Sequence, residues 1–122
     1  MELRQAAIGL SVGRAVLGLV LLIVPEPVAK GWIGPRGAEA PVATLARSVG
    51  VRDVALGAGG AIALLRGDDS APAWLAGAAV CDLGDIAATA IARGSLPAAG
   101  VRGTIALAGG SAVLAALAAA RS

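Results

Sequence analysis

Four long apolar segments make up most of the chain, and short polar or Pro/Gly-rich stretches separate them. These segments predict helices at about residues 5–24, 43–65, 71–92 and 97–120. Each segment is long enough to supply the roughly 20 residues that a helix needs to cross the hydrocarbon core of a bilayer. The pattern therefore predicts an all-α fold, a four-transmembrane-helix bundle with both termini on the same side, forming a single domain over residues 1–122.

The composition also favours a membrane location. Hydrophobic residues make up 57% of the chain and charged residues only 15%, against about 25% charged residues in a typical soluble domain. The mean hydropathy is +0.83. There is no Phe or Tyr and there are only two Trp, while Ala and Gly are abundant. Small residues let membrane helices approach each other closely, so we expect an integral membrane protein whose first partner is the lipid bilayer.

The same composition argues against several classes of function. The net charge is only +2, and the basic residues are dispersed without interleaved aromatic residues, which argues against nucleic-acid binding. The chain has no His and a single cysteine, Cys81, so it offers no ordinary zinc or haem ligand set and no disulfide. We therefore expect no metal, no cofactor and no enzymatic activity, and Cys81 is expected to pack between helices.

The ratio of arginine to lysine indicates the kind of genome that encodes the chain. Arginine outnumbers lysine nine to one, and Ala and Gly dominate the composition, a bias that favours a GC-rich bacterial genome. We expect a multi-pass protein of the bacterial cytoplasmic (inner) membrane. The basic residues outside the predicted spans balance three against three between the two sides, so the positive-inside rule predicts no orientation.

A secretory signal peptide is the alternative interpretation of the first apolar segment. Arg14 interrupts the apolar region, however, and the Pro25-Glu26-Pro27 stretch after it offers no small-x-small cleavage site. The segment is therefore predicted to remain as a membrane span.

Three residues are predicted to lie near the membrane–water interface. Trp32 belongs to a short amphipathic stretch after the first span, and Trp74 stands at the start of the third span. Tryptophan side chains anchor helices at the level of the lipid headgroups. Arg47, near the start of the second span, has a side chain long enough to reach water from within the bilayer.

Charged residues inside the predicted spans are the most informative feature of the sequence. A central Arg or Asp adds about 2.5–3.5 kcal/mol to the cost of inserting a helix, so opposite charges on neighbouring helices are expected to pair. Asp53 and Asp82 lie about equally far from the polar turn at residues 66–70, roughly 17 Å away at 1.5 Å per residue. Arg52 and Asp82 are therefore predicted to meet near the middle of the bilayer.

Helical spacing predicts that these charges face the interior of the bundle. Gly50, Asp53 and Gly57 follow one another at steps of three and four residues, which places them on one face of the second span. The same spacing places Asp82 and Asp85 on one face of the third span. The predicted buried network is centred on Arg52 and Asp82 and contains three arginines and three aspartates: Arg14, Arg52, Arg102, Asp53, Asp82 and Asp85.

Two interpretations of this network are open from the sequence. The ion pairs can fix the partners and register of the helices, or the network can form a site for an anionic ligand, a lipid headgroup or a proton. With Arg47 included, there are four arginines and three aspartates, and this surplus positive charge favours an anionic solute or a lipid headgroup. A narrower alternative is that Asp82 and Asp85 share a proton, although each is more readily paired with a different arginine.

The charged motifs carry a family resemblance. Arg14 is followed by an apolar run into Pro25, then by Arg47-x-x-Gly50-x-Arg52-Asp53-x-x-x-Gly57, and then by Asp82-x-x-Asp85. This arrangement resembles a group of small four-helix bacterial membrane proteins that are broadly similar to the DoxX-like proteins. The resemblance implies a compact four-helix membrane fold in which the Arg/Asp positions are hallmarks. It also implies an association with oxidoreductase complexes at the quinone level, for which this chain offers no cofactor ligand.

The sequence leaves three functional hypotheses. The leading one is a non-enzymatic accessory or oligomerising subunit, held together by the network and partnered by a second copy or by another membrane protein. The second is a component of a transporter or permease for an anionic solute, a lipid headgroup or a proton. The third is a membrane subunit of a quinone-linked oxidoreductase.

Overall fold

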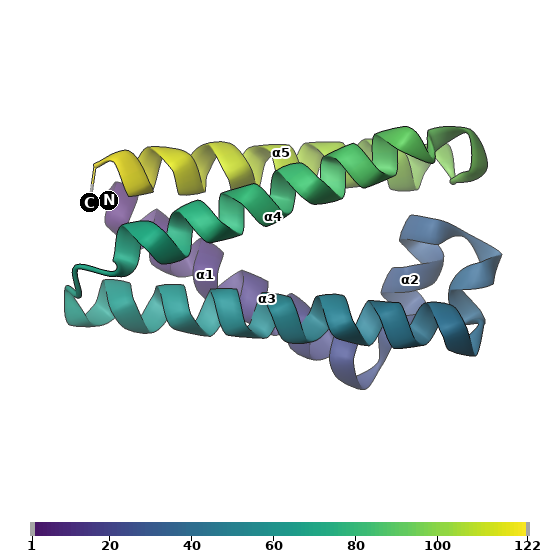
Figure 1. Ribbon diagram of the computed structural model, residues 1–122, viewed down its shortest axis with the longest axis horizontal. Helices are drawn as coiled ribbons and strands as arrows, with labels where there is room; N and C mark the ends of the chain where they lie inside the picture. Colours follow the sequence, from purple (N-terminus) through teal and green to yellow (C-terminus); the bar gives the residue numbers. More distant parts are fainter. Residues whose placement is uncertain (1, 122) are drawn as a thin grey trace.

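The computed structural model describes residues 2–121, and these form helices joined by short turns. The elements are α1 (Leu3–Ile23), α2 (Pro25–Ile33), η1 (Pro35–Ala38, a 3₁₀ turn), α3 (Ala40–Arg66), α4 (Ala71–Ile91), η2 (Arg93–Ser95, a 3₁₀ turn) and α5 (Ala98–Ala120). The four long helices run along the same axis, and α1 begins at the end of the bundle where α5 finishes (Figure 1). The predicted all-α, four-span fold with both ends on one side is confirmed.

The outer surface of the bundle is suited to lipid. All four long helices are long and apolar enough to cross a membrane, and only 22–39% of the residues in their most apolar windows are buried inside the protein. Large apolar side chains therefore point outward; Val16, Ile91 and Leu107 are each more than half exposed. Such a surface is unfavourable in water and is expected against acyl chains. The chain is a multi-pass membrane protein.

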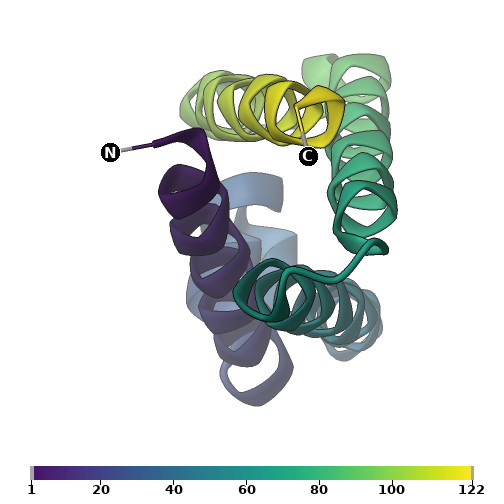
Figure 2. The same cartoon turned by 90° about the vertical axis from the view of Figure 1, so that its left-hand side faces the viewer.

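Glycine residues bring α1 and α3 into close contact. A Cβ atom added to Gly50 would lie 2.6 Å from the carbonyl oxygen of Gly18, and one added to Gly57 would collide with the backbone at Ser11. Glycine residues on the facing sides of both helices allow the backbones to approach this closely. Small residues commonly play this part where membrane helices pack together, because no hydrophobic driving force holds helices together in lipid. The α1/α3 pair lies beside a second pair, α4 and α5 (Figure 2).

The segment after the first span is a regular helix that covers one end of the bundle. Pro25 occupies the first turn of α2, where its missing N–H costs nothing, and Val24 breaks the path from α1. A Cβ atom on Gly100 would lie 2.6 Å from the carbonyl oxygen of Gly31, so α2 rests on the start of α5. The sequence predicted only a short amphipathic stretch here, because nine residues carry too little periodicity to distinguish a helix from a loop.

Trp32 fastens α2 to the second helix pair. Its indole Nε1–H donates a hydrogen bond of 3.0 Å to the hydroxyl oxygen of Thr89 on α4. Thr89 is only 2% exposed, so its hydroxyl group has no water as a substitute partner. The interfacial role predicted for Trp32 is therefore accompanied by a specific attachment between helices.

Replacing Thr89 with valine is expected to lower the free energy of unfolding by about 1 kcal/mol, because the indole N–H loses its acceptor at nearly constant side-chain volume. Titration with SDS in mixed micelles, followed by circular dichroism, measures this change. Thr44→Val is the matched control, since the exposed Thr44 hydroxyl bonds only to the carbonyl of Ala40 in its own helix. Equal destabilisation by the two variants would contradict the attachment.

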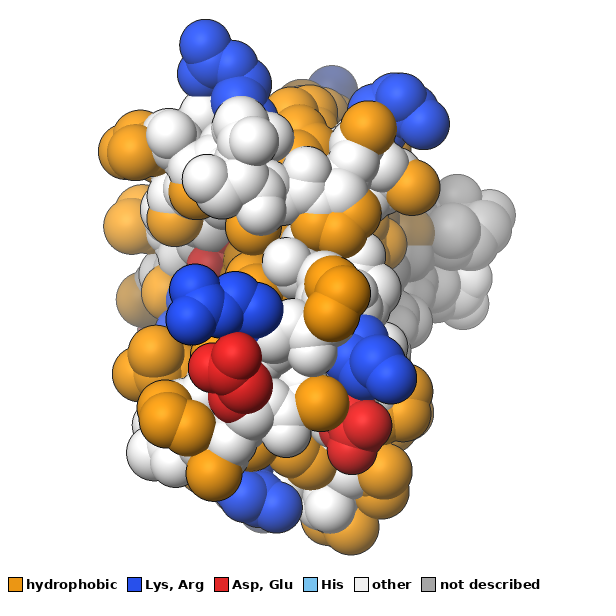
Figure 3. All heavy atoms as spheres, turned by 90° about the vertical axis from the view of Figure 1, so that its right-hand side faces the viewer, with side chains coloured by type: hydrophobic (Ala, Val, Ile, Leu, Met, Phe, Trp, Pro, Cys, Tyr) orange, Lys and Arg blue, Asp and Glu red, His pale blue; other side chains and the backbone are white. Residues whose placement is uncertain are grey.

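The end of the bundle that carries α2 and η1 has paired surface charges. Figure 3 shows this face, where basic and acidic side chains lie next to each other among apolar ones. Lys30 lies 3.7 Å from Glu26, and Arg36 lies 3.2 Å from Glu39. All four side chains are about half exposed or more, so these pairs contribute little to stability.

Candidate functional site

Arg14 is the best-enclosed cation of the protein's interior. Its two terminal nitrogens donate hydrogen bonds of 3.0 and 2.6 Å to the two carboxylate oxygens of Asp82, and Nη2 also donates to Ser111 Oγ at 2.8 Å. The Arg14 and Asp82 side chains are only 8% and 6% exposed. A paired fork of this kind is the strongest ordinary contact between a guanidinium and a carboxylate. It connects α1 to both α4 and α5.

Arg52 makes a second fork one turn further along α4. Its Nη1 and Nη2 donate to the two oxygens of Asp85 at 3.0 and 2.8 Å. Arg52 also donates to Asp53 Oδ1 on its own helix, at 3.3 Å from Nε and 3.2 Å from Nη2. Arg14 Nη1 approaches that same oxygen to 3.6 Å. Asp53 therefore stands between the two arginines and joins the two forks into one network.

The forks connect the two helix pairs. Arg14 lies on α1 and Arg52 on α3, whereas both carboxylates that they grip, Asp82 and Asp85, lie on α4. Asp82 and Asp85 therefore bond different arginines, as one of the two interpretations of the sequence predicted. Within residues 2–121, no buried side-chain nitrogen or oxygen lacks a hydrogen-bond partner.

The predicted Arg52–Asp82 pair is wrong. Arg52 bonds Asp85, and Asp82 is taken by Arg14. The prediction used depth in the bilayer, and depth alone does not fix how a helix is rotated about its axis. Asp82 faces Arg14 of α1, and Asp85 faces Arg52 of α3.

Arg102 lies outside the network. Its side chain is exposed, and no ion pair or hydrogen bond to its side chain occurs among the described residues. The reason is rotational: Gly100 faces α2, and a residue two positions further along lies about 200° around the helix, on the opposite side. On α3 the same step from Gly50 points Arg52 toward α4, whereas on α5 it places Arg102 on an exposed side of the helix.

The other residues predicted at the interface have distinct surroundings. Arg47 is exposed, and its Nε donates a hydrogen bond of 3.2 Å to the carbonyl oxygen of Leu22, near the end of α1. The Trp74 ring packs flat over Gly59 of α3, where an added Cβ atom would meet the ring at 2.5 Å. Trp74 therefore fastens α4 to α3 at the end of the bundle near the chain termini, opposite α2.

A cavity of about 440 Å³ lies beside the network. Its charged wall contains Arg14, Asp53, Asp82 and Asp85, and Trp32 of α2 is part of its lining. Leucine and valine side chains from the surrounding helices make up much of the remainder. The volume is in the range of small-molecule sites, which are mainly apolar with a few polar groups that orient the ligand. Sequence reasoning missed this cavity, because a space between helices leaves no pattern in the residues.

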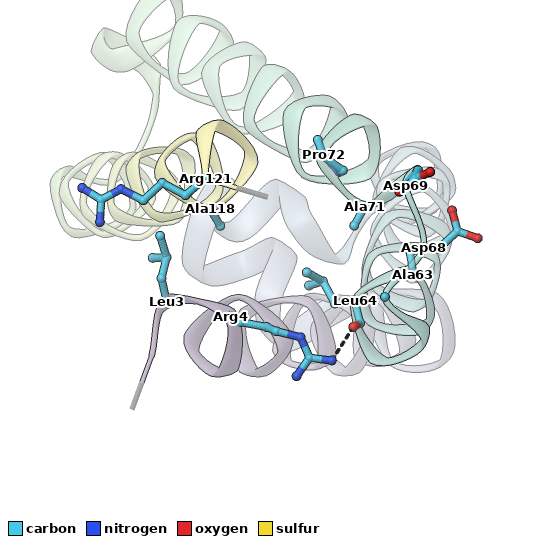
Figure 4. A pocket seen from close by; sticks show the side chains of 11 residues that line it. Leu3, Arg4, Ala63, Leu64, Asp68, Asp69, Ala71, Pro72, Ala118 and Arg121 are labelled. Carbon is cyan, nitrogen blue, oxygen red and sulfur yellow. Dashed lines mark hydrogen bonds between the residues drawn. The ribbon is translucent and has the colours of Figure 1, made fainter.

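A smaller hollow, of about 350 Å³, opens at the end of the bundle that carries the chain termini. Leu3, Leu64 and Ala118 line it, and Arg4 donates a hydrogen bond of 2.7 Å to the carbonyl oxygen of Leu64 (Figure 4). Asp68 stands at its rim. The hydrogen bond from the Ser70 amide holds the pKa of the Asp68 carboxyl below its ordinary value, so this rim is charged at neutral pH.

The charge balance of the interior differs from the prediction. With Arg102 and Arg47 outside, two arginines, Arg14 and Arg52, face three aspartates. When every group is ionised, the network therefore carries one surplus negative charge, in place of the surplus positive charge that the sequence suggested. An anionic solute, the ligand favoured by the sequence, is disfavoured by this balance.

Comparisons of this chain with protein-family models, with curated proteins and with solved structures find no match. The fold and the charge network therefore stand on the chain's own sequence and structure. The resemblance to DoxX-like proteins, and the quinone-linked role that it implies, stay predictions.

Proposed function

We propose that the protein is a non-enzymatic accessory subunit of a membrane assembly, in which the Arg/Asp network holds two helix pairs in one fixed arrangement. The observation that supports this proposal is the division of the forks between the pairs: Arg14 and Arg52 each reach across to α4. Buried ion pairs add little net stability compared with apolar contacts, but they specify which surfaces meet. A network of this kind suits a small bundle that must present a defined outer face to a partner.

The chemistry of the chain also favours a structural role. It contains no His and a single Cys. The three aspartates of the network, Asp53, Asp82 and Asp85, each form an ion pair with an arginine. The arginine-rich, alanine-rich composition favours the cytoplasmic membrane of a bacterium as its location. The partner is proposed to be a second copy of this chain or another membrane protein.

Native mass spectrometry of the tagged protein, extracted from its expression membrane in mild detergent, tests this proposal. The chain alone has a mass of 11.7 kDa. The expected result is a discrete complex with a second copy or with one other membrane protein at fixed stoichiometry. A lone chain in every mild detergent and in lipid nanodiscs would overturn the proposal.

The double variant Arg14→Leu with Asp82→Leu separates the two interpretations of the network. If the network only holds the bundle, this variant folds and keeps its partner. A folded double variant that loses the partner would instead place the network at the partner's binding surface.

A carrier or transporter component is the second candidate, and the cavity beside the network favours it. The cavity joins apolar walls to a charged wall inside a membrane protein, which is the combination that intramembrane ligand sites use. Because the network has a surplus negative charge, the ligand of such a carrier is proposed to be a proton or a cation and not an anion.

A further inference from the structure

We propose that the cavity between α1, α5 and the network binds a monovalent organic cation with a bulky apolar body. The inference deepens the second candidate function, and it can fail without affecting the accessory role. It rests on three features of the cavity: its charge, its aromatic wall and its opening.

The surplus negative charge of the network favours a ligand with one positive charge. With every group ionised, the lining holds one cation, Arg14, and three anions, Asp53, Asp82 and Asp85. Arg52 pairs with Asp53 and Asp85 without belonging to the lining. Both oxygens of Asp82 and of Asp85 accept from a guanidinium. Asp53 accepts its hydrogen bonds through Oδ1 alone. Among the described residues that line the cavity, Oδ2 of Asp53 is therefore the carboxylate oxygen that accepts no hydrogen bond and can contact a ligand. A single buried negative charge in a low-dielectric site attracts a cation strongly.

Trp32 supplies a second element of cation recognition. It is one of only two aromatic residues in the chain, and it lines the same cavity as the three aspartates. Its hydrogen bond to Thr89 fixes the orientation of the indole ring. Cations bind over the faces of aromatic rings, and tryptophan is the strongest of these partners. An alkylammonium or phosphonium group fits between such a ring and a carboxylate better than a neutral or anionic group does.

The cavity opens sideways, which indicates how the ligand arrives. Gly9 and Gly13 of α1 and Leu107 of α5 belong to its lining and are exposed, at positions inside two membrane-spanning helices. A Cβ atom added to Gly9 or Gly13 would meet nothing within 4 Å. The opening therefore faces the acyl chains, and α2 lies across the adjoining end. A ligand that enters through lipid must carry an apolar body.

Tetraphenylphosphonium and tetraphenylborate are matched probes, because they have nearly the same shape and opposite charge. Binding is measured by equilibrium dialysis against the full chain in lipid nanodiscs, with empty nanodiscs subtracted. We expect saturable binding of one phosphonium per chain and at least tenfold weaker binding of the borate. Asp53→Asn is expected to weaken phosphonium binding at least tenfold.

Gly13→Leu tests the location without disturbing the network. The added side chain enters open space at the mouth of the cavity, so the variant is expected to fold and to lose saturable phosphonium binding. Gly84→Leu is the matched control, because Gly84 is also exposed with open space around it and lies outside the cavity lining. No saturable phosphonium binding by the wild type, equal or tighter binding of the borate, or unchanged binding in Gly13→Leu would each overturn the proposal.

Discussion

Asp82→Leu is expected to lower the free energy of unfolding by about 3–5 kcal/mol, the largest effect of any single charge removal in this chain. The variant leaves the Arg14 guanidinium enclosed at 8% exposure with only Ser111 and a distant Asp53 oxygen to accept its hydrogen bonds. An unpaired cation in a membrane interior is costly because neither water nor lipid can solvate it there. SDS titration of the purified protein in mixed micelles gives the change directly.

The double variant Arg14→Leu with Asp82→Leu is expected to recover most of this loss. Removing both partners leaves neither Arg14 nor Asp82 as an unpaired ion, while Arg52 keeps its contacts with Asp53 and Asp85. Apolar replacements of buried ion pairs are often neutral or stabilising. Arg36→Leu, which breaks the exposed pair with Glu39, is a control expected to cost less than about 1 kcal/mol. If Asp82→Leu were as mild as Arg36→Leu, the buried fork would have no part in holding the bundle.

Gly50→Val is expected to have the second-largest effect, a loss of about 3 kcal/mol or failure to form the α1/α3 pair. The new Cβ atom would lie 2.6 Å from the Gly18 carbonyl oxygen and 2.8 Å from the Leu22 amide nitrogen, and backbone atoms cannot move aside as a flexible side chain does. Overpacking in a well-filled interior usually costs about 1–3 kcal/mol even when side chains can adjust. The same SDS titration measures this loss.

Gly110→Val provides the comparison, because an added Cβ atom there meets nothing within 4 Å. Both substitutions place the same β-branched residue in a helix, so the difference between them isolates the helix contact. Similar losses in the two variants would show that helix propensity, and not the approach of α1 to α3, controls stability.

The positions of the spans and their buried faces could be predicted from the sequence because both depend on local spacing. The lengths of apolar runs located four helices, and steps of three and four residues placed Gly50, Asp53 and Gly57 on one face. All three are buried in the structure. The spacing similarly predicted the buried face of α4 that carries Asp82.

The partners of the charges could not be predicted, because they depend on how each helix is rotated and on which neighbour arrives at that face. The pairing of Arg14 with Asp82 joins residues 68 positions apart, and no local pattern encodes that choice. The exposure of Arg102 has the same origin, since its fate depends on a contact between Gly100 and α2. The cavity, being a gap between helices, is a property of the assembled bundle alone.

The long separation of Arg14 from its partner has a consequence for biosynthesis. A ribosome adds about 5–20 residues per second, so roughly 3–14 s pass between synthesis of this arginine and synthesis of its carboxylate. During that interval the first span is expected to stay beside the translocation channel or to hold its guanidinium toward water. Release into the bilayer as a finished bundle then awaits the third span, and a nascent chain arrested before residue 82 is expected to remain sensitive to quality-control proteases.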